Sequence, residues 1–313
     1  MLDVLIVNYN TASLLKPMFD ALEAASDGLE VRFWIVDNAS RDDSVNVLQK
    51  HFPRFTAEVN SVNVGFGRAN NQLLKHVQGQ YVLLLNTDAF VEPDTLRKTL
   101  AYMESHPKCG LLGVKLLSRD GSVQPSCRYF PTPWNVFLSR TGLVKIFPRT
   151  RLVDDPYWDP MKEQECDWVP GCYYLFRRQV LDSVGLFDPL YFLYCEEVDH
   201  CKRVKEAGWK VIYYPETSVV HLGGESAKSD SELNAVNQIS SLQIESELLY
   251  FRKHHGLIGV LSHLMLTAIG CVYIALKDLM RGRGWFVAKS KLKAFAATWR
   301  LFAQTSWATI PTR

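Results

Sequence analysis

The chain has 313 residues, of which 47% are hydrophobic and 22% are charged, a composition typical of an ordinary globular protein. This composition excludes the disordered, collagen-like and disulfide-scaffold classes, and the length suits one large domain or two. The formal net charge of +2 conceals an asymmetry, because residues 249–313 contain ten basic residues and one acid. This tail carries +9 and residues 1–248 carry −7, which favours a tail that contacts an anionic surface.

Neither the cysteines nor the N-terminus indicates a secreted protein. The seven cysteines are odd in number and form no Cys-x-x-Cys pair, so free thiols in a reducing cytosol are expected rather than a disulfide framework or a zinc site. The first residues, Met1–Val7, lack a basic segment, and no signal peptide is predicted.

Short apolar runs alternate with helical patterns along the first hundred residues. Strands are predicted over 4–7, 31–36 and 81–85, and helices over 14–25, 43–51, 63–76 and 94–105. The strands are apolar on both faces, which is typical of a parallel sheet covered by helices. Ligands bind at the carboxyl ends of such strands. Polar clusters follow each predicted strand at that end, which is a first indication of function.

The second half begins with an irregular stretch, 118–165. After it we predict strands over 166–176, 209–213 and a run ending at 221, and helices over 178–184, 195–208 and about 229–253. The expected domains are 1–255, with a nucleotide-binding half to about 117 and an acceptor half from about 118, and a basic, amphipathic helical tail over 256–313. Residues 257–276 carry no formal charge. They could lie in a membrane interface, span a membrane, or pack in the core or against another chain.

Two clusters contain residues suited to binding a metal. Asn86-Thr87-Asp88 follows an apolar strand, and a carboxylate there can bind a divalent cation that holds a diphosphate, although Asn and Asp also form caps and turns. His221 ends an apolar run before two glycines. Its imidazole can ligate a metal, although a single histidine at a strand end is commonly structural.

Two further clusters could take part in chemistry or binding. Glu196-Glu197-Val198-Asp199 places three acids at a helix start, where the helix dipole favours them. Alternatively, one acid crowded by like charges has a raised pKa and acts as a general base. Gly65-x-Gly67 at a strand-to-helix junction could contact a nucleotide. Asn70 occupies the position of the third glycine of a dinucleotide fingerprint, which disfavours a nicotinamide site.

Together, these clusters resemble family 2 glycosyltransferases of the GT-A fold, in particular the bacterial rhamnosyltransferase-like branch. The resemblance covers about residues 2–255. It is carried by Val7–Asn10, Val36–Ser40, Asn63–Gly67, Ala69–Asn71, Leu85–Asp88, Trp168–Gly171, Gly185–Asp188, Glu196–Asp199, Ala207–Trp209 and His221. It implies an α/β fold, with a Rossmann-like, mostly parallel sheet, flanking helices and a C-terminal helical membrane-associating extension.

The resemblance also implies roles for individual residues. Asp88 and His221 would ligate Mg²⁺ or Mn²⁺, with Asn86 replacing the first Asp of the family's Asp-x-Asp motif. The donor nucleotide-sugar would contact Asn8, Tyr9, Asn10, Asp37, Asn38, Asn63, Gly65, Gly67, Arg68, Asn70, Asn86 and Thr87. The acceptor would contact Trp168, Gly171, Asp188 and Glu196. Glu197 would be the catalytic base, with Asp199 in reserve, although Glu is one methylene longer than the family's Asp.

The reaction implied is an inverting, metal-assisted transfer of a sugar from a nucleoside diphosphate, with dTDP-rhamnose as the donor expected first. The acceptor would be a hydroxyl of a glycan or a lipid-linked glycan in cell-surface polysaccharide synthesis. A cytoplasmic protein, peripheral on the inner membrane face through its tail, is expected, with no nucleic-acid partner. A homo-oligomer is also possible. The alternatives are a non-catalytic nucleotide-sugar-binding protein and a nicotinamide-dependent oxidoreductase.

Overall fold

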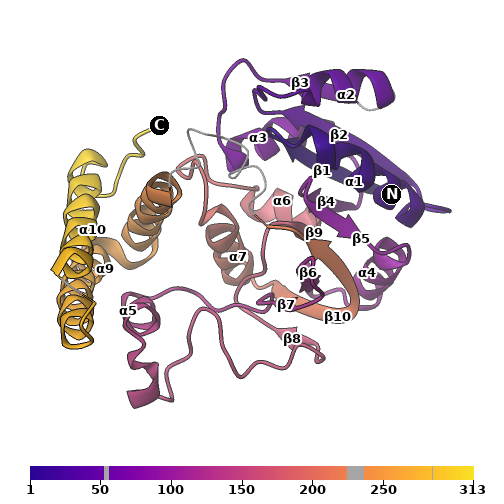
Figure 1. Ribbon diagram of the computed structural model, residues 1–313. Helices are drawn as coiled ribbons and strands as arrows, with labels where there is room; N and C mark the ends of the chain where they lie inside the picture. Colours follow the sequence, from indigo (N-terminus) through magenta and orange to yellow (C-terminus); the bar gives the residue numbers. More distant parts are fainter. Residues whose placement is uncertain (53–55, 224–235, 284) are drawn as a thin grey trace. The chain divides into compact units, whose positions relative to one another are not determined.

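A computed structural model describes residues 1–52, 56–223, 236–283 and 285–313. The chain forms two compact units (Figure 1). The sheet unit contains residues 1–128, 157–189 and the described part of 196–235, and the helical unit contains residues 129–156, 190–195 and the described part of 236–313. The domain boundary predicted at residue 255 stays a prediction, because compactness alone does not define a folding domain.

The sheet unit is built on one sheet with the strand order β3-β2-β1-β4-β9-β6-β10-β5. The strands are β1 (Leu2–Asn8), β2 (Val31–Asp37), β3 (Thr56–Val59), β4 (Tyr81–Leu85), β5 (Ala89–Val91), β6 (Cys109–Leu117), β9 (Tyr173–Arg177) and β10 (Lys210–His221), with β7 (Val123–Gln124) and β8 (Gln164–Glu165) pairing beside this path. The pairs β3–β2, β2–β1, β1–β4 and β6–β10 are parallel. Strand β9 is antiparallel to both of its neighbours, and β5 is antiparallel to β10.

The α/β fold predicted from the sequence is confirmed, but the sheet is mixed rather than mostly parallel. The sequence pattern could not show this, because β9 is as apolar as a parallel strand: all five of its residues are buried. The two strands predicted over 209–221 are one continuous strand, β10, whose register shifts against β6 between Tyr214 and Ser218.

Helices cover both faces of the sheet. The helices of this unit are α1 (Ala12–Ala25), α2 (Ser44–His51), α3 (Phe66–Leu73), the 3-10 turn η1 (Leu74–His76), α4 (Thr95–Ser105), α6 (Arg178–Val184) and α7 (Glu196–Glu206). Alternate strand residues such as Val4 and Leu83 form one core with α1, α2 and α4. On the opposite face, Tyr174 of β9 contacts His200 of α7. Side chains that alternate along a strand supply both cores.

The helical unit contains α5 (Pro133–Thr141), η2 (Leu143–Ile146), α9 (Val236–Met280) and α10 (Trp285–Gln304). Helix α9 consists of two segments joined at Gly256, whose φ of 65° is not helical. A Cβ at Gly259 would lie 2.2 Å from the Cβ of His255, so this bend requires both glycines. Of the helix predicted over 229–253, residues 229–235 lie outside the described residues.

Candidate active site

The ends of β1 and β2 are joined by a buried polar network. The Asn8 amide donates to Asp37 Oδ2 at 2.6 Å and to Ser40 Oγ at 3.1 Å, while the Ser40 backbone N–H donates to Asp37 Oδ1 at 2.9 Å. Asn10, with φ of 52°, accepts from the Arg41 backbone N–H. These hydrogen bonds fix the orientation of the Asp37 carboxylate and shape the loops after both strands.

A second set of amides joins the end of β2 to the loop before α3. The Asn38 amide donates to Asn63 Oδ1 at 2.8 Å, and Asn38 Oδ1 accepts from the Val64 backbone N–H and from the Asn60 side chain. Asn63 Oδ1 also accepts from the Gly65 backbone N–H. With φ of 89°, Gly65 has a left-handed conformation that favours glycine. The predicted donor-binding residues Asp37, Asn38, Asn63 and Gly65 therefore belong to adjoining loops at one edge of the sheet.

Thr11 connects this network to the metal motif. It occupies the N-cap position of α1 but makes no side-chain capping bond. Its hydroxyl instead contacts Asn8 Oδ1 at 2.7 Å and the Thr87 hydroxyl at 2.8 Å. Thr87 and Asp88 are themselves buried. The end of β4 is thus held against the end of β1.

Asp88 and His221 face each other across the β5–β10 pairing. Ala89 pairs with His221, the Leu222 N–H donates to the Asp88 carbonyl, and His221 Nε2 lies 3.6 Å from Asp88 Oδ1. Gln124 donates to the His221 carbonyl at 2.7 Å, so its Oε1, 2.9 Å from His221 Nδ1, accepts the imidazole proton. Burial lowers the pKa of His221, although Asp88 opposes this effect. The imidazole is therefore neutral, and its Nε2 lone pair faces Asp88.

These groups suit a divalent cation that binds together with a diphosphate. A carboxylate oxygen and a neutral imidazole nitrogen are good metal ligands, and a hydrogen bond from the second imidazole nitrogen is the usual partner of a ligating histidine. Within the described residues, no group of three His, Cys, Asp or Glu side chains could hold a metal. Mg²⁺ is commonly bound through one or two protein ligands together with waters and substrate phosphates.

Gly171 and Cys172, the two residues before β9, adjoin both the Asn86-Thr87-Asp88 motif and the predicted base, Glu197. The Asn86 N–H donates to the Cys172 carbonyl at 3.1 Å. A Cβ on Gly171 would lie 4.0 Å from the Cβ of Glu197 and 3.8 Å from Phe66. Burial raises the pKa of the Cys172 thiol, and the charges of Asp88 and Glu197 raise it further. Both carboxylates therefore act on the same buried residue.

Glu196 at the start of α7 is buried, and its neighbour Glu197 is half-buried. The Oε2 atom of each is buried and has no hydrogen-bond partner among the described residues. Burial and the neighbouring Glu197 raise the pKa of Glu196 well above its usual value. Burial also raises the pKa of Glu197, but backbone hydrogen bonds and the positive charge of Arg128 oppose this rise. Glu196 therefore holds a proton more tightly than Glu197, which makes Glu197 the better candidate to accept a proton.

Asp199 has a different environment. It is fully buried and forms an ion pair with Arg203 at 2.8 Å. Arg203 in turn donates to the carbonyls of Val184 and Leu186. These contacts give Asp199 a structural role in tying α7 to the loop after α6, and they favour Glu197 over the reserve base.

Two of the predicted acceptor residues, Trp168 and Gly171, are linked to Glu197, the first through Arg128 and the second directly. The Arg128 guanidinium carbon lies 4.6 Å from the centre of the Trp168 ring, and the two residues exchange backbone hydrogen bonds. Asp188 is half-buried and follows Phe187. Arg128 therefore both stacks on a predicted acceptor residue and acts on the predicted base, although no local sequence pattern singles it out.

Three predicted donor residues have local packing roles. The Asn70 amide is buried and donates to the Phe66 carbonyl one turn earlier. Arg68 Nε donates to the Pro189 carbonyl at 3.0 Å. A Cβ on Gly67 would lie 3.2 Å from Phe187. Gly67 is thus required for close packing, not for a dinucleotide fingerprint.

Sequence reasoning missed several residues of this region. Ser40, Thr11, Gln124, Cys172 and Arg128 make the contacts described above. Ser40 was within a quoted motif and could have been found. By contrast, Gln124 pairs with a residue 97 positions away and Thr11 with one 76 positions away, and no local pattern marks such pairs.

Comparisons with known proteins indicate the class of enzyme. Residues 3–151 match the family model "Glycosyl transferase family 2". The chain is 27% identical over 247 residues to an N-acetylglucosaminyl-diphospho-decaprenol L-rhamnosyltransferase of Mycobacterium tuberculosis, covering 73% of this chain and 78% of the relative. It is 26% identical over 244 residues to the rhamnosyltransferase WbbL of Escherichia coli, covering 73% and 86%.

Solved structures show the same fold. The mannosyltransferase PcManGT of Pyrobaculum calidifontis, in complex with GDP-Man and Mn²⁺, aligns with a TM-score of 0.56 at 14% identity, covering 98% of this chain and 87% of that one. Residues 1–349 of Staphylococcus aureus TarS, in complex with UDP, align with a TM-score of 0.51 at 14% identity, covering 97% and 91%. The predicted resemblance is confirmed: the chain has a GT-A-like fold and is a glycosyltransferase, whose residues 3–151 match the family 2 model.

Proposed function

We propose that this glycosyltransferase moves a sugar, L-rhamnose first among the candidates, from a nucleoside diphosphate to a hydroxyl of a lipid-linked glycan, with inversion at the anomeric carbon. One observation carries the proposal: the Asn86 N–H donates to the Cys172 carbonyl at 3.1 Å, and a Cβ on the preceding Gly171 would lie 4.0 Å from the Cβ of Glu197, so the candidate metal motif and the candidate base both adjoin one short segment. The two carboxylates can then act on the leaving group and on the nucleophile of one reaction.

Asn8, Asp37, Asn38 and Asn63 would hold the nucleoside, since their loops adjoin at the carboxyl ends of β1 and β2. Asp88 and His221 would hold a Mg²⁺ or Mn²⁺ ion, which when bound neutralises the departing diphosphate. The Mn²⁺ in the PcManGT structure supports a divalent cation of this kind.

Glu197 would accept the proton of the acceptor hydroxyl. The hydroxyl oxygen forms the new bond to the anomeric carbon as the bond to the diphosphate breaks, so a single displacement inverts the configuration. A well-placed base contributes about 10²–10⁴-fold in rate. Because burial holds the pKa of Glu197 above its usual value, activity should rise with pH above the range in which an exposed glutamate ionises.

The donor and the acceptor are inferred from the relatives' names. Two relatives are named rhamnosyltransferases, and the M. tuberculosis relative is named for a diphospho-decaprenol acceptor. dTDP-rhamnose is therefore the donor to test first, and a prenyl-diphosphate-linked N-acetylglucosamine is the acceptor.

The test is a transfer assay with dTDP-rhamnose, UDP-hexoses and GDP-mannose as separate donors, with the anomeric configuration of the product read by NMR. We expect turnover with dTDP-rhamnose only when Mg²⁺ or Mn²⁺ is present, and a product of inverted configuration. Retained configuration would contradict the proposed displacement. Nucleotide binding without transfer from any donor, to this or a simpler glycan acceptor, would support the alternative of a non-catalytic binding protein.

A further inference from the structure

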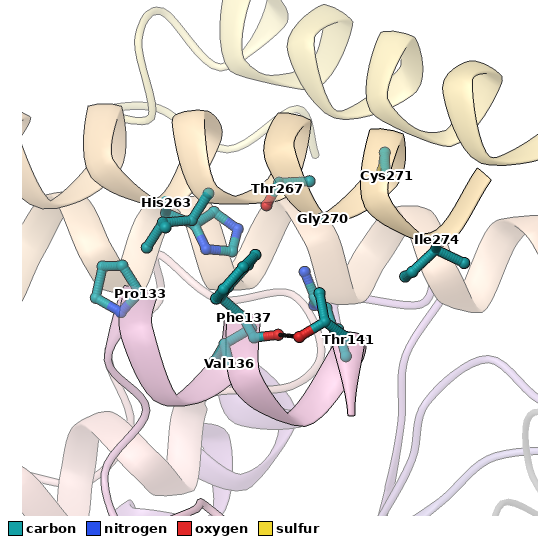
Figure 2. Close-up of a pocket in the computed structure, with 11 residues that line it drawn as sticks. Pro133, Val136, Phe137, Thr141, His263, Thr267, Gly270, Cys271 and Ile274 are labelled. Atoms are coloured by element: carbon teal, nitrogen blue, oxygen red, sulfur yellow. Dashed lines mark hydrogen bonds between the residues drawn. The ribbon is translucent and has the colours of Figure 1, made fainter. Parts of the chain in front are cut away.

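The second segment of α9, residues 257–280, is covered by protein on two sides. Val260, Leu264 and Ala275 are buried along one side, and α10 lies beside the helix (Figure 1). On another side, Thr267 and Gly270 face Phe137 and Thr141 of α5 (Figure 2). The apolar crevice between α5 and α9 has a volume of only about 50 Å³, too small for a substrate.

The remaining side of this segment is apolar and exposed. Every strongly exposed residue between 257 and 280 is apolar, and we call this set the α9 face: Ile258, Leu261, Met265, Ile269, Val272, Leu276, Leu279 and Met280. Most of them recur at intervals of three or four residues, so they share one stripe of the helix. Ile258 is 80% exposed and Met265 is 59% exposed. At 1.5 Å per residue the stripe is roughly 33 Å long, and contiguous apolar surface of this extent marks an interaction site.

Basic and aromatic residues bracket the α9 face. Arg252 and Lys253 precede it, and Arg281 and Arg283 follow it. The single acid of the tail, Asp278, is paired with Arg283 at 3.0 Å. Trp285, which is 63% exposed, comes next. Lysine and arginine beside an apolar stripe, followed by tryptophan, are typical of helices that lie at the surface of an anionic bilayer.

The contacts between the second segment of α9 and α5 indicate whether this segment would lie in the plane of a membrane or cross it. By length and composition α9 could span a bilayer. However, Arg140 of α5, whose side chain is 41% exposed, lines the same crevice as His263 and Thr267, and it forms an ion pair with Glu247, which lies 3.8 Å from His263 Nε2. In a spanning arrangement this charged pair would be close to the hydrocarbon core, where ionised side chains are costly.

We propose that the α9 face is a membrane-docking surface, which inserts into one leaflet of an anionic bilayer while α9 lies in the plane of the membrane. The charge of the tail, +9 over residues 249–313, matches anionic headgroups. The same charge disfavours a second copy of this chain as the occupant, because two such tails would repel each other. The proposal does not depend on which sugar is transferred.

The test is flotation of the purified full chain with preformed vesicles of phosphatidylcholine alone or with phosphatidylglycerol. We expect binding to the anionic vesicles, weaker binding as salt is raised, and little binding to the neutral ones. The double variant Met265→Glu, Ile269→Glu should bind on the order of 10²-fold more weakly, because two large side chains no longer enter hydrocarbon. Val59→Glu, which alters another exposed apolar residue, should bind like the wild type.

Folding of each variant is checked by its melting temperature and by binding of a nucleoside diphosphate. If the Glu pair does not fold, Met265→Gln with Ile269→Gln replaces it. Unchanged vesicle binding by a folded face variant would overturn the proposal. It would also be overturned if the wild type ignored anionic vesicles and sedimented as a dimer that the face variant made monomeric, since the α9 face would then pair two chains.

Discussion

Two regions show unusual burial of opposite kinds: the α9 face of the helical unit, and the strand-end region of the sheet unit, by which we mean the loops after β1, β2 and β4 together with the start of α7. In the strand-end region, Asn8, Asp37, Asp88 and Glu196 are buried, although polar and charged groups normally stay in water. On the α9 face, large apolar side chains are exposed. Burying a polar group costs free energy unless it is paired, and exposing an apolar stripe forgoes the stability that its burial would give.

The comparison indicates two kinds of partner. Paired amides and carboxylates in adjoining loops suit a small polar ligand with many hydrogen-bonding groups, such as a nucleotide-sugar. A straight apolar stripe without polar groups has no means of recognising such a ligand, but it suits an extended apolar partner. Within the strand-end region itself, the carboxylates differ as well: Asp199 has an ion-pair partner, whereas one oxygen of each neighbouring glutamate has none.

The largest expected effect comes from removing the proposed base. Glu197→Gln keeps the size of the side chain but cannot accept a proton, so kcat should fall about 10²–10⁴-fold. Nucleotide binding should stay close to that of the wild type, because Glu197 is assigned to the acceptor hydroxyl. Steady-state kinetics and calorimetric titration with the nucleoside diphosphate measure the two quantities separately. A Gln variant with wild-type kcat would eliminate Glu197 as the base.

Replacing the nearby acid Asp199 should have the opposite effect: the stability of the fold should fall while the activity is mostly kept. Asp199→Asn breaks the buried pair with Arg203, and leaving one partner of such a pair uncompensated costs about 3 kcal/mol or more of unfolding free energy. The folded fraction should retain most of its kcat. Urea unfolding followed by circular dichroism measures the loss, and Asp20→Asn, in the exposed pair with Lys16, is a control expected to change stability by under ~1 kcal/mol. Loss of kcat without loss of stability would make Asp199 the base.

A smaller effect is expected for the link between β1 and β4. Thr11→Val removes a buried hydroxyl and leaves the Thr87 hydroxyl and Asn8 Oδ1 each without a partner, at a cost of about 1–3 kcal/mol. Differential scanning calorimetry should show a lower melting temperature and a smaller shift on nucleotide binding. Thr309→Val removes an exposed hydroxyl bonded to Ser306 and should leave both unchanged. Equal melting temperatures for the two variants would contradict the role given to Thr11.

The smallest expected effect is a pH-dependent gain in stability. Because the folded pKa of Glu196 is raised above its usual 4.5, its carboxyl favours the folded state below that pH, and this contribution is lost as the pH rises through the raised pKa. The Glu196→Gln variant cannot ionise at this position, so it does not lose stability as the pH rises. The variant should therefore melt at a higher temperature than the wild type near pH 8, with the difference shrinking toward pH 5. A difference that grows toward acid pH would mean that Glu196 is ionised and paired in the fold.

Local patterns predicted the parts of this molecule that depend on neighbouring residues. Asp37, Asp88 and His221 end or follow apolar strands, and the structure places Asp88 beside His221, whereas their roles in binding a ligand stay predictions. The antiparallel direction of β9 was not predictable from the sequence. Because both faces of β9 are buried, its residues do not alternate between apolar and polar, and that alternation is the usual sign of an antiparallel strand. The contrast between Glu197 and Asp199 also needed the structure, since both are acids in the first turn of α7 and only their partners differ.

The bend in α9 is another feature that the sequence contained but local reasoning did not use. Hydropathy alone assigns no role to Gly256 or Gly259, whereas in the structure they set where the second segment begins. Which apolar residues of that segment stay exposed depends on α5 and α10, and therefore on packing between distant parts of the chain.

The central claim, that the strand ends bind a nucleoside diphosphate with a divalent cation through Asp88, is tested most directly by thermal unfolding. The wild type and Asp88→Ala are melted with dTDP, UDP or GDP, with and without Mn²⁺. At ~100 times Kd a ligand stabilises the fold by about 2.7 kcal/mol, or roughly 5–10 °C for a chain of this size. We predict such a shift for dTDP only with Mn²⁺, and its loss in Asp88→Ala. An equal shift in both proteins, or none with any nucleotide, would contradict the account.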